Sequence, residues 1–197
     1  TFEARYLKEA LRLGAAMMEL FKDPESGGLL FSANDADDLP YRSIDYYDGA
    51  IPSGNSIALL SLLRLFHLSG ESQWEEKAWD LARAALPSVR GQAAGHSMML
   101  CSLDLAAGPA VQVALLRGHA PNGGEEITRM LRAIRSRFLP NCSVLLVDGE
   151  EIREIAPFTR DMEPEQEKPT AYVCSGRLCS LPVTGLPGLL AFLDKSE

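Results

Sequence analysis

The sequence predicts a mainly α-helical protein, in which part of an α/α toroid is followed by a small parallel α/β segment. Over residues 1–108, amphipathic helical patterns alternate with patterns that are apolar on nearly every side, as two concentric layers of helices require. Over residues 109–197 the pattern changes to strand, helix and strand, which is the order of a βαβ unit. We therefore expect two domains, a helical-hairpin region over 1–108 and an α/β subdomain over 109–197.

Four helices are expected in the helical-hairpin region. Residues 1–22 carry apolar side chains at helical spacing on one face, whereas residues 56–68 leave hardly any polar face. A third, amphipathic helix begins at Ser72, and Pro87 is expected to bend or end it. Residues 96–106 then form a second apolar helix. These helices make two hairpins, so we expect that a toroidal ring could not close within this chain.

The α/β subdomain is expected to contain three strands and two helices. Because a helix connects the first two strands, these strands should run parallel. The expected elements are, in order, a strand over 110–116, an amphipathic helix marked by Ile127 to Phe138, a strand over 143–147, a loop over 148–169, a strand over 170–174 and a short helix over 187–193.

The loop Asp48–Ser56, which precedes the first apolar helix, combines turn formers, helix caps and one acid. Pro52 fixes its own φ, and Ser53 or Asn55 can cap the helix by accepting hydrogen bonds from its first N–H groups. Two interpretations stay open. The loop either delivers polar side chains to a site at the start of a buried helix, or it only shapes the entry to that helix.

The composition is that of an ordinary soluble globular protein. Of the 197 residues 46% are hydrophobic and 23% charged, and the net charge is −8. An acidic surface argues against nucleic acid or anionic membranes as partners, and no apolar run is long enough to cross a bilayer. The four cysteines do not look like a secreted disulfide framework, so we expect a cytoplasmic, reducing setting.

Two motifs resemble those of a known family. The run YDGAIPSGNS at residues 47–56 looks like the "DGAxPSGNS" signature of the YyaL family. The runs TAYVC at 170–174 and CSLPVT at 179–184 resemble the closing "AYVCxxxxCxxP" segment of that family. The family consists of thioredoxin-domain-containing proteins and includes a spermatogenesis-associated member in animals. The resemblance covers essentially the whole chain.

The resemblance implies a larger architecture around this chain. Members of the family carry an N-terminal thioredoxin-like domain and then a six-hairpin α/α region similar to N-acylglucosamine 2-epimerases and six-hairpin glycosidases. This sequence matches only the C-terminal part. The thioredoxin-like domain and the earlier hairpins are therefore its expected partners, and no redox motif of that domain can be carried over.

Asp48 and His96 are the candidate catalytic residues, since each precedes an expected inner helix. In a toroid such loops surround a central cavity, where an acid and a histidine could transfer protons at a sugar carbon. The candidate substrate-binding residues are Arg42, Tyr47, Ser53 and Asn55. In the simpler alternative, Asp48 caps its own loop, His96 caps a helix or faces solvent, and the aromatic and Arg residues only pack.

Cys174 and Cys179 are separated by four residues, which is neither the thioredoxin spacing nor a complete metal site. Free thiols are the favoured interpretation, with a zinc or redox clip as the alternative. We expect no metal and no cofactor.

Two functions follow from these observations. The favoured one is a non-catalytic region, with a regulatory or scaffold role, that exposes apolar surface and associates with itself or with the missing domains. The alternative is a carbohydrate-binding toroid with epimerase-like or glycosidase-like activity.

Overall fold

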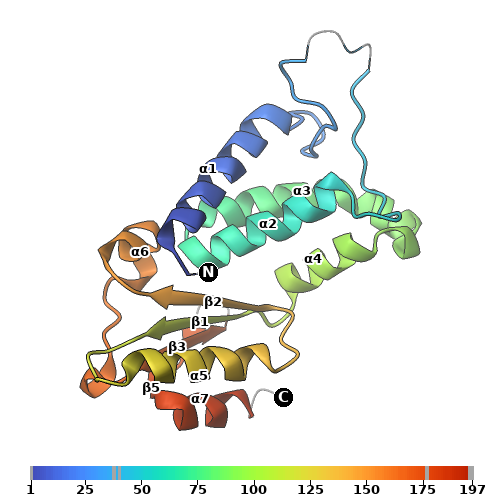
Figure 1. Ribbon diagram of the computed structural model, residues 1–197. Helices are drawn as coiled ribbons and strands as arrows, with labels where there is room; N and C mark the ends of the chain where they lie inside the picture. Colours follow the sequence, from blue (N-terminus) through green and yellow to red (C-terminus); the bar gives the residue numbers. More distant parts are fainter. Residues whose placement is uncertain (1, 37–38, 40, 176–177, 195–197) are drawn as a thin grey trace. The chain divides into compact units, whose positions relative to one another are not determined.

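The computed structural model describes residues 2–36, 39, 41–175 and 178–194. The chain divides into two compact units (Figure 1). One unit comprises Arg5–Gly108, and the other comprises Pro109–Glu197 together with the first residues of the chain. The protein is mainly helical with a small mixed sheet, so the prediction of a mainly α-helical chain is confirmed.

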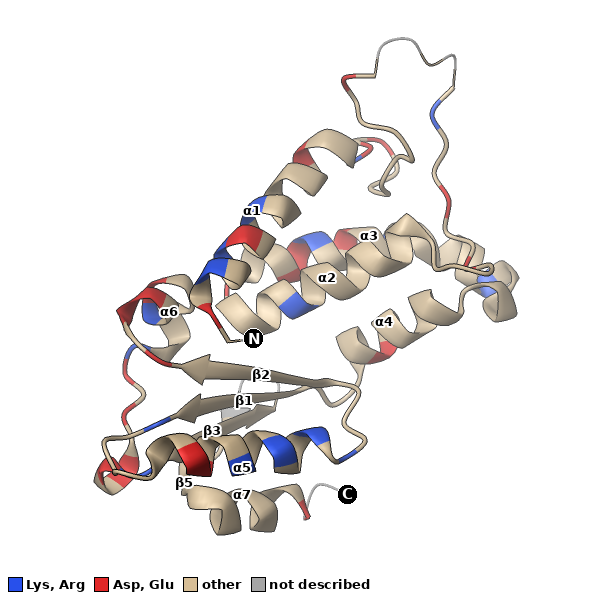
Figure 2. Ribbon diagram, in the orientation of Figure 1, with Lys and Arg blue, Asp and Glu red and all other residues tan. Residues whose placement is uncertain are grey.

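The helical unit is built around α2, a helix without a continuous polar face. Its helices are α1 (Ala4–Phe21), α2 (Gly54–Ser69), α3 (Ser72–Gly91), the short 3-10 helix η1 (Ala93–Gly95) and α4 (Ser97–Ala107). Figure 2 shows that α2 and α4 carry few charged residues. Because an apolar helix must be covered by other protein, α2 packs against both α3 and α4 and buries Leu59, Leu62 and Leu63.

The first helix, α1, approaches α2 and α3 closely at Gly14. A Cβ atom at this position would lie 2.6 Å from Leu65 Cδ1 and 3.2 Å from the ring of Trp74. The absence of a side chain at Gly14 thus lets the helix backbone approach these two large residues.

The third helix continues through Pro87 to Gly91, so of the two expected outcomes, a bend or an end at Pro87, the end is wrong. Proline removes one backbone donor from the helix. Leu81 and Ala85 before Pro87 and Val89 after it are all buried. This packing on both sides of the proline supports the helix across the missing hydrogen bond.

The α/β unit contains a mixed sheet with the strand order β2-β1-β3-β4, and β5 pairs with β3. Its elements are β1 (Val111–Leu116), α5 (Gly123–Arg135), β2 (Cys142–Val147), α6 (Glu150–Ile155), the 3-10 helices η2 (Pro157–Thr159) and η3 (Glu165–Glu167), β3 (Thr170–Ser175), β4 (Leu178–Cys179), β5 (Val183–Thr184) and α7 (Gly185–Leu193). The βαβ unit of β1, α5 and β2 has parallel strands, as predicted.

The prediction of a purely parallel sheet is wrong, because β3 runs antiparallel to β1. Strand β2 ends at Val147 beside Leu116, and β3 begins at Thr170 beside the same residue. A third parallel strand would have to start at the opposite end, about 20 Å away for six residues. The connection over residues 148–169 contains the six-residue helix α6 and the 3-10 helices η2 and η3, but no long helix that returns the chain along the sheet to that opposite end. The chain therefore enters β3 where β2 ended.

One face of the sheet and the helices α5 and α7 enclose the core of this unit (Figure 1). Val113, Leu115 and Val173 from the strands pack with Met130 of α5 and Leu189 of α7. Phe138 does not belong to this apolar face, contrary to the prediction. Helix α5 ends at Arg135, and the side chain of Phe138 is 93% exposed.

Among the described residues, no helix combines the length and the hydropathy that a membrane span requires.

The core of the α/β unit leads to a stability prediction. Leu115 is 0% exposed at the centre of the sheet, whereas Leu181 in the same unit is 87% exposed. We expect Leu115→Ala to lower the free energy of unfolding by about 2–5 kcal/mol, because it leaves a cavity. The matched change Leu181→Ala should alter it by less than about 0.5 kcal/mol. Urea unfolding of both variants measures the difference, and equal effects would contradict the assigned core.

Candidate functional site

The Asp48 carboxylate connects the loop before α2 to the beginning of α4. Its Oδ1 accepts a hydrogen bond from the Ser53 N–H at 2.8 Å, and its Oδ2 accepts one from the Met99 N–H at 2.9 Å. The Asp48 N–H in turn donates to the Gly95 carbonyl at 2.8 Å. The side chain is 8% exposed. Met99 lies in the first turn of α4, where N–H groups have no partner within the helix, so Asp48 satisfies a donor of that helix end.

Ser53 is the residue that caps α2. Its backbone is extended, and its Oγ accepts a hydrogen bond from the Ser56 N–H at 3.1 Å. The hydroxyl groups of Ser53 and Ser56 lie 2.8 Å apart, and the Ser102 hydroxyl of α4 donates to the Ser56 carbonyl at 3.1 Å. The prediction that Ser53 or Asn55 caps this helix is therefore confirmed for Ser53.

The Asn55 side chain holds a distant segment against the start of α2. Its Oδ1 accepts a hydrogen bond from the Leu29 N–H at 2.7 Å, and its Nδ2 donates to the Leu29 carbonyl at 2.9 Å. The same Nδ2 donates to the Asp45 carbonyl at 2.9 Å. The Asn55 amide thus binds both backbone polar groups of Leu29, as a residue on a neighbouring strand would. It is buried and committed to backbone groups on both of its ends.

His96 lies at the N-cap position of α4, so it reaches the same helix end as Asp48. Its ring is buried, and its Nδ1 lies 2.7 Å from the Gln92 carbonyl, which makes Nδ1 the protonated nitrogen. Tyr47 packs edge-on to the imidazole, with ring centroids 6.4 Å apart. The two oxygens of Asp48 accept hydrogen bonds from backbone N–H groups. His96 Nδ1 donates its hydrogen bond to a backbone carbonyl.

Arg42 supports a different part of the unit. Its Nη2 donates to the carbonyls of Asn34 and Ala36 at 2.8 and 3.0 Å. The structure thus gathers five of the six predicted site residues around the starts of α2 and α4, namely Tyr47, Asp48, Ser53, Asn55 and His96, whereas the contacts of Arg42 lie within its own loop.

The pKa of the Asp48 carboxyl lies below its ordinary value of 3.8. Burial acts to raise this pKa, but hydrogen bonds from the Ser53 and Met99 N–H groups, with further help from the Ser56 hydroxyl, outweigh it. Asp48 is therefore ionised at neutral pH. A carboxyl group that acts as a general acid needs its pKa shifted in the opposite direction.

A cavity of about 410 Å³ lies beside this group of residues, within the helical unit. Its walls come from α1, the segment Leu29–Phe31 and the loop from Asp45 to Asn55, and they are mostly apolar. Tyr47, Ser53 and Asn55 line it, but Asp48 and His96 are not among its lining residues.

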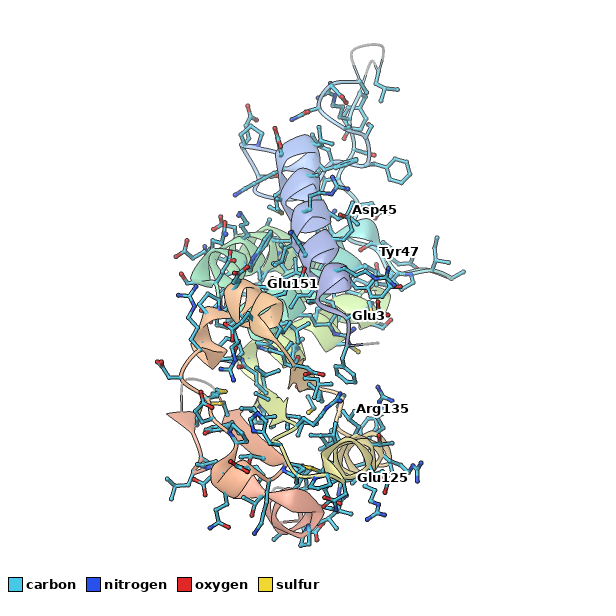
Figure 3. The ribbon with its side chains drawn as sticks, turned by 60° about the vertical axis from the view of Figure 1, so that its left-hand side comes forward. Glu3, Asp45, Tyr47, Glu125, Arg135 and Glu151 are labelled. Atoms are coloured by element: carbon cyan, nitrogen blue, oxygen red, sulfur yellow. A yellow bond between two sulfur atoms is a disulfide. The ribbon has the colours of Figure 1, made fainter. Side chains whose placement is uncertain are left out.

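Sequence reasoning missed Phe31 and Asp45 as lining residues of this cavity. Figure 3 shows Asp45 and Tyr47 as neighbours on this unit, where the Tyr47 N–H donates to Asp45 Oδ1 at 2.8 Å. The sequence signal for Asp45 was its place two residues before Tyr47. Phe31 had no signal, because its position depends on the distant contact between Asn55 and Leu29.

The α/β unit holds a disulfide between Cys174 and Cys179. The favoured interpretation of these residues as free thiols is therefore wrong. The two cysteines face each other across β3 and β4, and this register could not be read from their spacing alone. Over the described ranges, no cluster of three or more His, Cys, Asp or Glu side chains is arranged to hold a metal ion.

No family model matches the chain. The chain is 29% identical over 186 residues to spermatogenesis-associated protein 20 of mouse and of human, covering 92% of this chain and 23% of each relative. It is also 29% identical over 199 residues to an uncharacterized protein of Caenorhabditis elegans, covering 96% of this chain and 25% of that protein. The chain thus spans about a quarter of the length of the curated relatives that it matches. The predicted resemblance is confirmed to that extent, and membership of the YyaL family stays a prediction.

Proposed function

We propose that this chain is a non-catalytic region, with a scaffold or regulatory role, of a larger protein similar to spermatogenesis-associated protein 20. One observation carries the proposal. The Asp48 carboxylate, which is the best candidate for a catalytic acid or base, is engaged on both oxygens by backbone N–H groups of two helix starts. Its role is then to fix these helices relative to each other.

The surrounding polar groups support the same interpretation. A catalytic acid or base has to reach the proton that it transfers, directly or through one water molecule. The Asn55 amide is occupied by the backbone of Leu29 and Asp45, and His96 Nδ1 is occupied by Gln92. Neither Asp48 nor His96 lines the neighbouring cavity. Buried polar groups that are satisfied in this way stabilise one arrangement of the backbone.

The proposal includes the α/α toroid as the setting of the helical unit. Helices α2 and α4 pack against each other, and the Asp48 carboxylate binds N–H groups at the starts of both, which is the arrangement expected of neighbouring inner helices. This unit exposes apolar side chains, among them Phe31, Tyr41 and Ile51. Further hairpins, a thioredoxin-like domain or a second copy of the chain would cover this surface. A cytoplasmic location remains part of the same proposal.

Carbohydrate binding is the second candidate function, and the cavity is the observation that favours it. Tyr47 and Phe31 offer aromatic faces on which a sugar ring can stack, and Asp45 offers a carboxylate to its hydroxyl groups. This candidate requires binding in the cavity without chemistry at Asp48.

The structural role of Asp48 predicts the effect of removing its charge. Asp48→Asn puts an amide NH₂ against one of the two backbone donors, so we expect the free energy of unfolding to fall by about 1–3 kcal/mol. Asp45→Asn is the matched control, since its exposed side chain keeps one oxygen for the Tyr47 N–H. Urea unfolding measures both changes. A stable or stabilised Asp48→Asn variant is what a catalytic role would give, and it would sink the proposal.

The lowered pKa of Asp48 predicts how this contribution depends on pH. Because the pKa in the folded chain lies below the ordinary 3.8, ionised Asp48 stabilises the fold fully above pH 3.8. The contribution is lost as the pH falls through the folded-state pKa. The stability gap between the native chain and Asp48→Asn should therefore narrow below pH 3.8. A gap that widens on acidification would mean that the pKa is raised.

A titration with monosaccharides and disaccharides, followed by amide NMR shifts, separates the two candidate functions. The scaffold proposal predicts no shifts at millimolar ligand. Shifts at Phe31, Asp45 and Tyr47 alone would favour sugar binding in the cavity. Shifts that centre on Asp48 and His96, and that disappear in a folded Asp48→Asn variant, would instead support the acid/base pair and contradict the scaffold proposal.

A further inference from the structure

The disulfide of the α/β unit lies at the edge of its sheet. Cys174 of β3 and Cys179 of β4 are register partners, and Ser175 and Leu178 form the next pair. Strand β4 ends the strand order β2-β1-β3-β4. The disulfide therefore connects the last strand of the sheet to a strand in its interior.

The disulfide belongs to a polar row that crosses the sheet. Register places Ser143 of β2 beside Gln112 of β1, Gln112 beside Cys174, and Cys174 beside Cys179. Register partners point to the same face of a sheet. Ala171 and Val173, which alternate with Cys174 along β3, belong to the core under α5 and α7. The disulfide and its polar neighbours thus occupy the opposite face, outside that core.

The position of this disulfide is a poor one for a structural staple. It encloses only four residues, and the stabilisation that a disulfide gives by restricting the unfolded chain grows with the length of the loop it closes. Strand β3 is already held by six register pairs with β1 and by pairing with β5. The pairings of β1 with β2 and of β3 with β1 and β5 do not involve the disulfide.

The two sulfur atoms differ in how a reagent can reach them. Cys174 is 5% exposed, whereas Cys179 is an exposed residue on the last strand. Thiol–disulfide exchange proceeds by attack of a thiolate on one sulfur, and the accessible sulfur is attacked. Cys179 is therefore the position of attack, and Cys174 is the leaving group.

The attacking thiol does not come from this unit. Cys142, its other cysteine, packs against the core on the opposite face of the sheet from the disulfide. Burial also raises the pKa of the Cys142 thiol to about 11, so little of it is thiolate at neutral pH. A thiolate that reduces the disulfide therefore has to come from outside this unit.

We propose that Cys174 and Cys179 form a reversible dithiol–disulfide couple whose substrate is an external thiol, either a small dithiol or a protein dithiol. A thiolate of the reductant bonds to Cys179 Sγ, the Cys174–Cys179 bond breaks, and Cys174 leaves as a thiolate that takes up a proton. The second thiolate of the reductant then attacks the reductant's first sulfur, which is bonded to Cys179 in the mixed disulfide, and Cys179 is released as a thiolate that takes up a proton. Two electrons and two protons pass to the cysteines, and the reductant becomes a disulfide.

The first test follows reduction of the folded chain by dithiothreitol, with Cys101→Ser and Cys142→Ser as the background. Alkylation and mass spectrometry count the free thiols, and circular dichroism follows the fold. The proposal predicts that both cysteines become alkylated together while the spectrum stays native, and that removing the reductant in air restores the disulfide. Reduction that occurs only after denaturant unfolds the chain would overturn the couple.

The second test fixes the order of attack with two matched variants in the same background. Treated with glutathione disulfide, Cys174→Ser leaves the exposed Cys179, and Cys179→Ser leaves the buried Cys174. We expect the glutathione adduct to form at least about tenfold faster at Cys179, because access controls the exchange rate. Equal rates, or faster reaction at Cys174, would contradict the assigned position of attack. Native circular dichroism of both variants shows that a slow reaction is not a folding defect.

Discussion

The helical unit depends on a single buried carboxylate. The α2 helix is apolar on nearly every side, and a helix of this kind could slide or rotate among its neighbours without losing apolar contact. Asp48 removes that freedom, because its two oxygens hold the Ser53 and Met99 N–H groups at the starts of α2 and α4. Buried polar contacts of defined geometry select one packing arrangement where apolar contacts alone would permit several. The loop before α2 thus fixes the position of α2 relative to α4. The same polar residues that make the loop resemble a catalytic site are the ones that hold the two helices in place.

The sequence predicted the helices well, because their apolar patterns are long and local. The helix cap at Ser53 could also be predicted, because it depends on neighbouring residues. The parallel pairing of β1 and β2 could be predicted because a short crossover connects the two strands. The direction of β3 was not, because it depends on where the long connection returns to the sheet. The bond from Ser53 to Asp48 lies within one loop and was one of the open alternatives. Leu29, however, lies 26 residues from Asn55 and Met99 lies 51 residues from Asp48, so no local pattern could show these two partners. The disulfide was missed for a similar reason, since strand register decides whether Cys174 meets Cys179.

The two units place their polar chemistry differently. In the helical unit, the conspicuous polar side chains are buried and bound to backbone groups, as a structural role demands. In the α/β unit, the disulfide lies at a sheet edge with one accessible residue, in a position where the strands do not need it. In a reducing compartment, disulfides that form are usually transient, catalytic or redox-sensing. A reversible couple at Cys174 and Cys179 would therefore be compatible with the cytoplasmic location that we propose.

The central claim is that the Asp48 carboxylate is a bound structural anion and not a free acid or base. The most direct measurement is the NMR titration of the Asp48 side-chain carboxyl carbon in the folded chain. The structural role predicts a pKa below the ordinary value of 3.8, because the Ser53 and Met99 N–H groups stabilise the charged form. A pKa raised above 3.8 would show that burial dominates and that the carboxyl group is free to exchange protons. That result would contradict the account and restore Asp48 as the candidate acid of an active site.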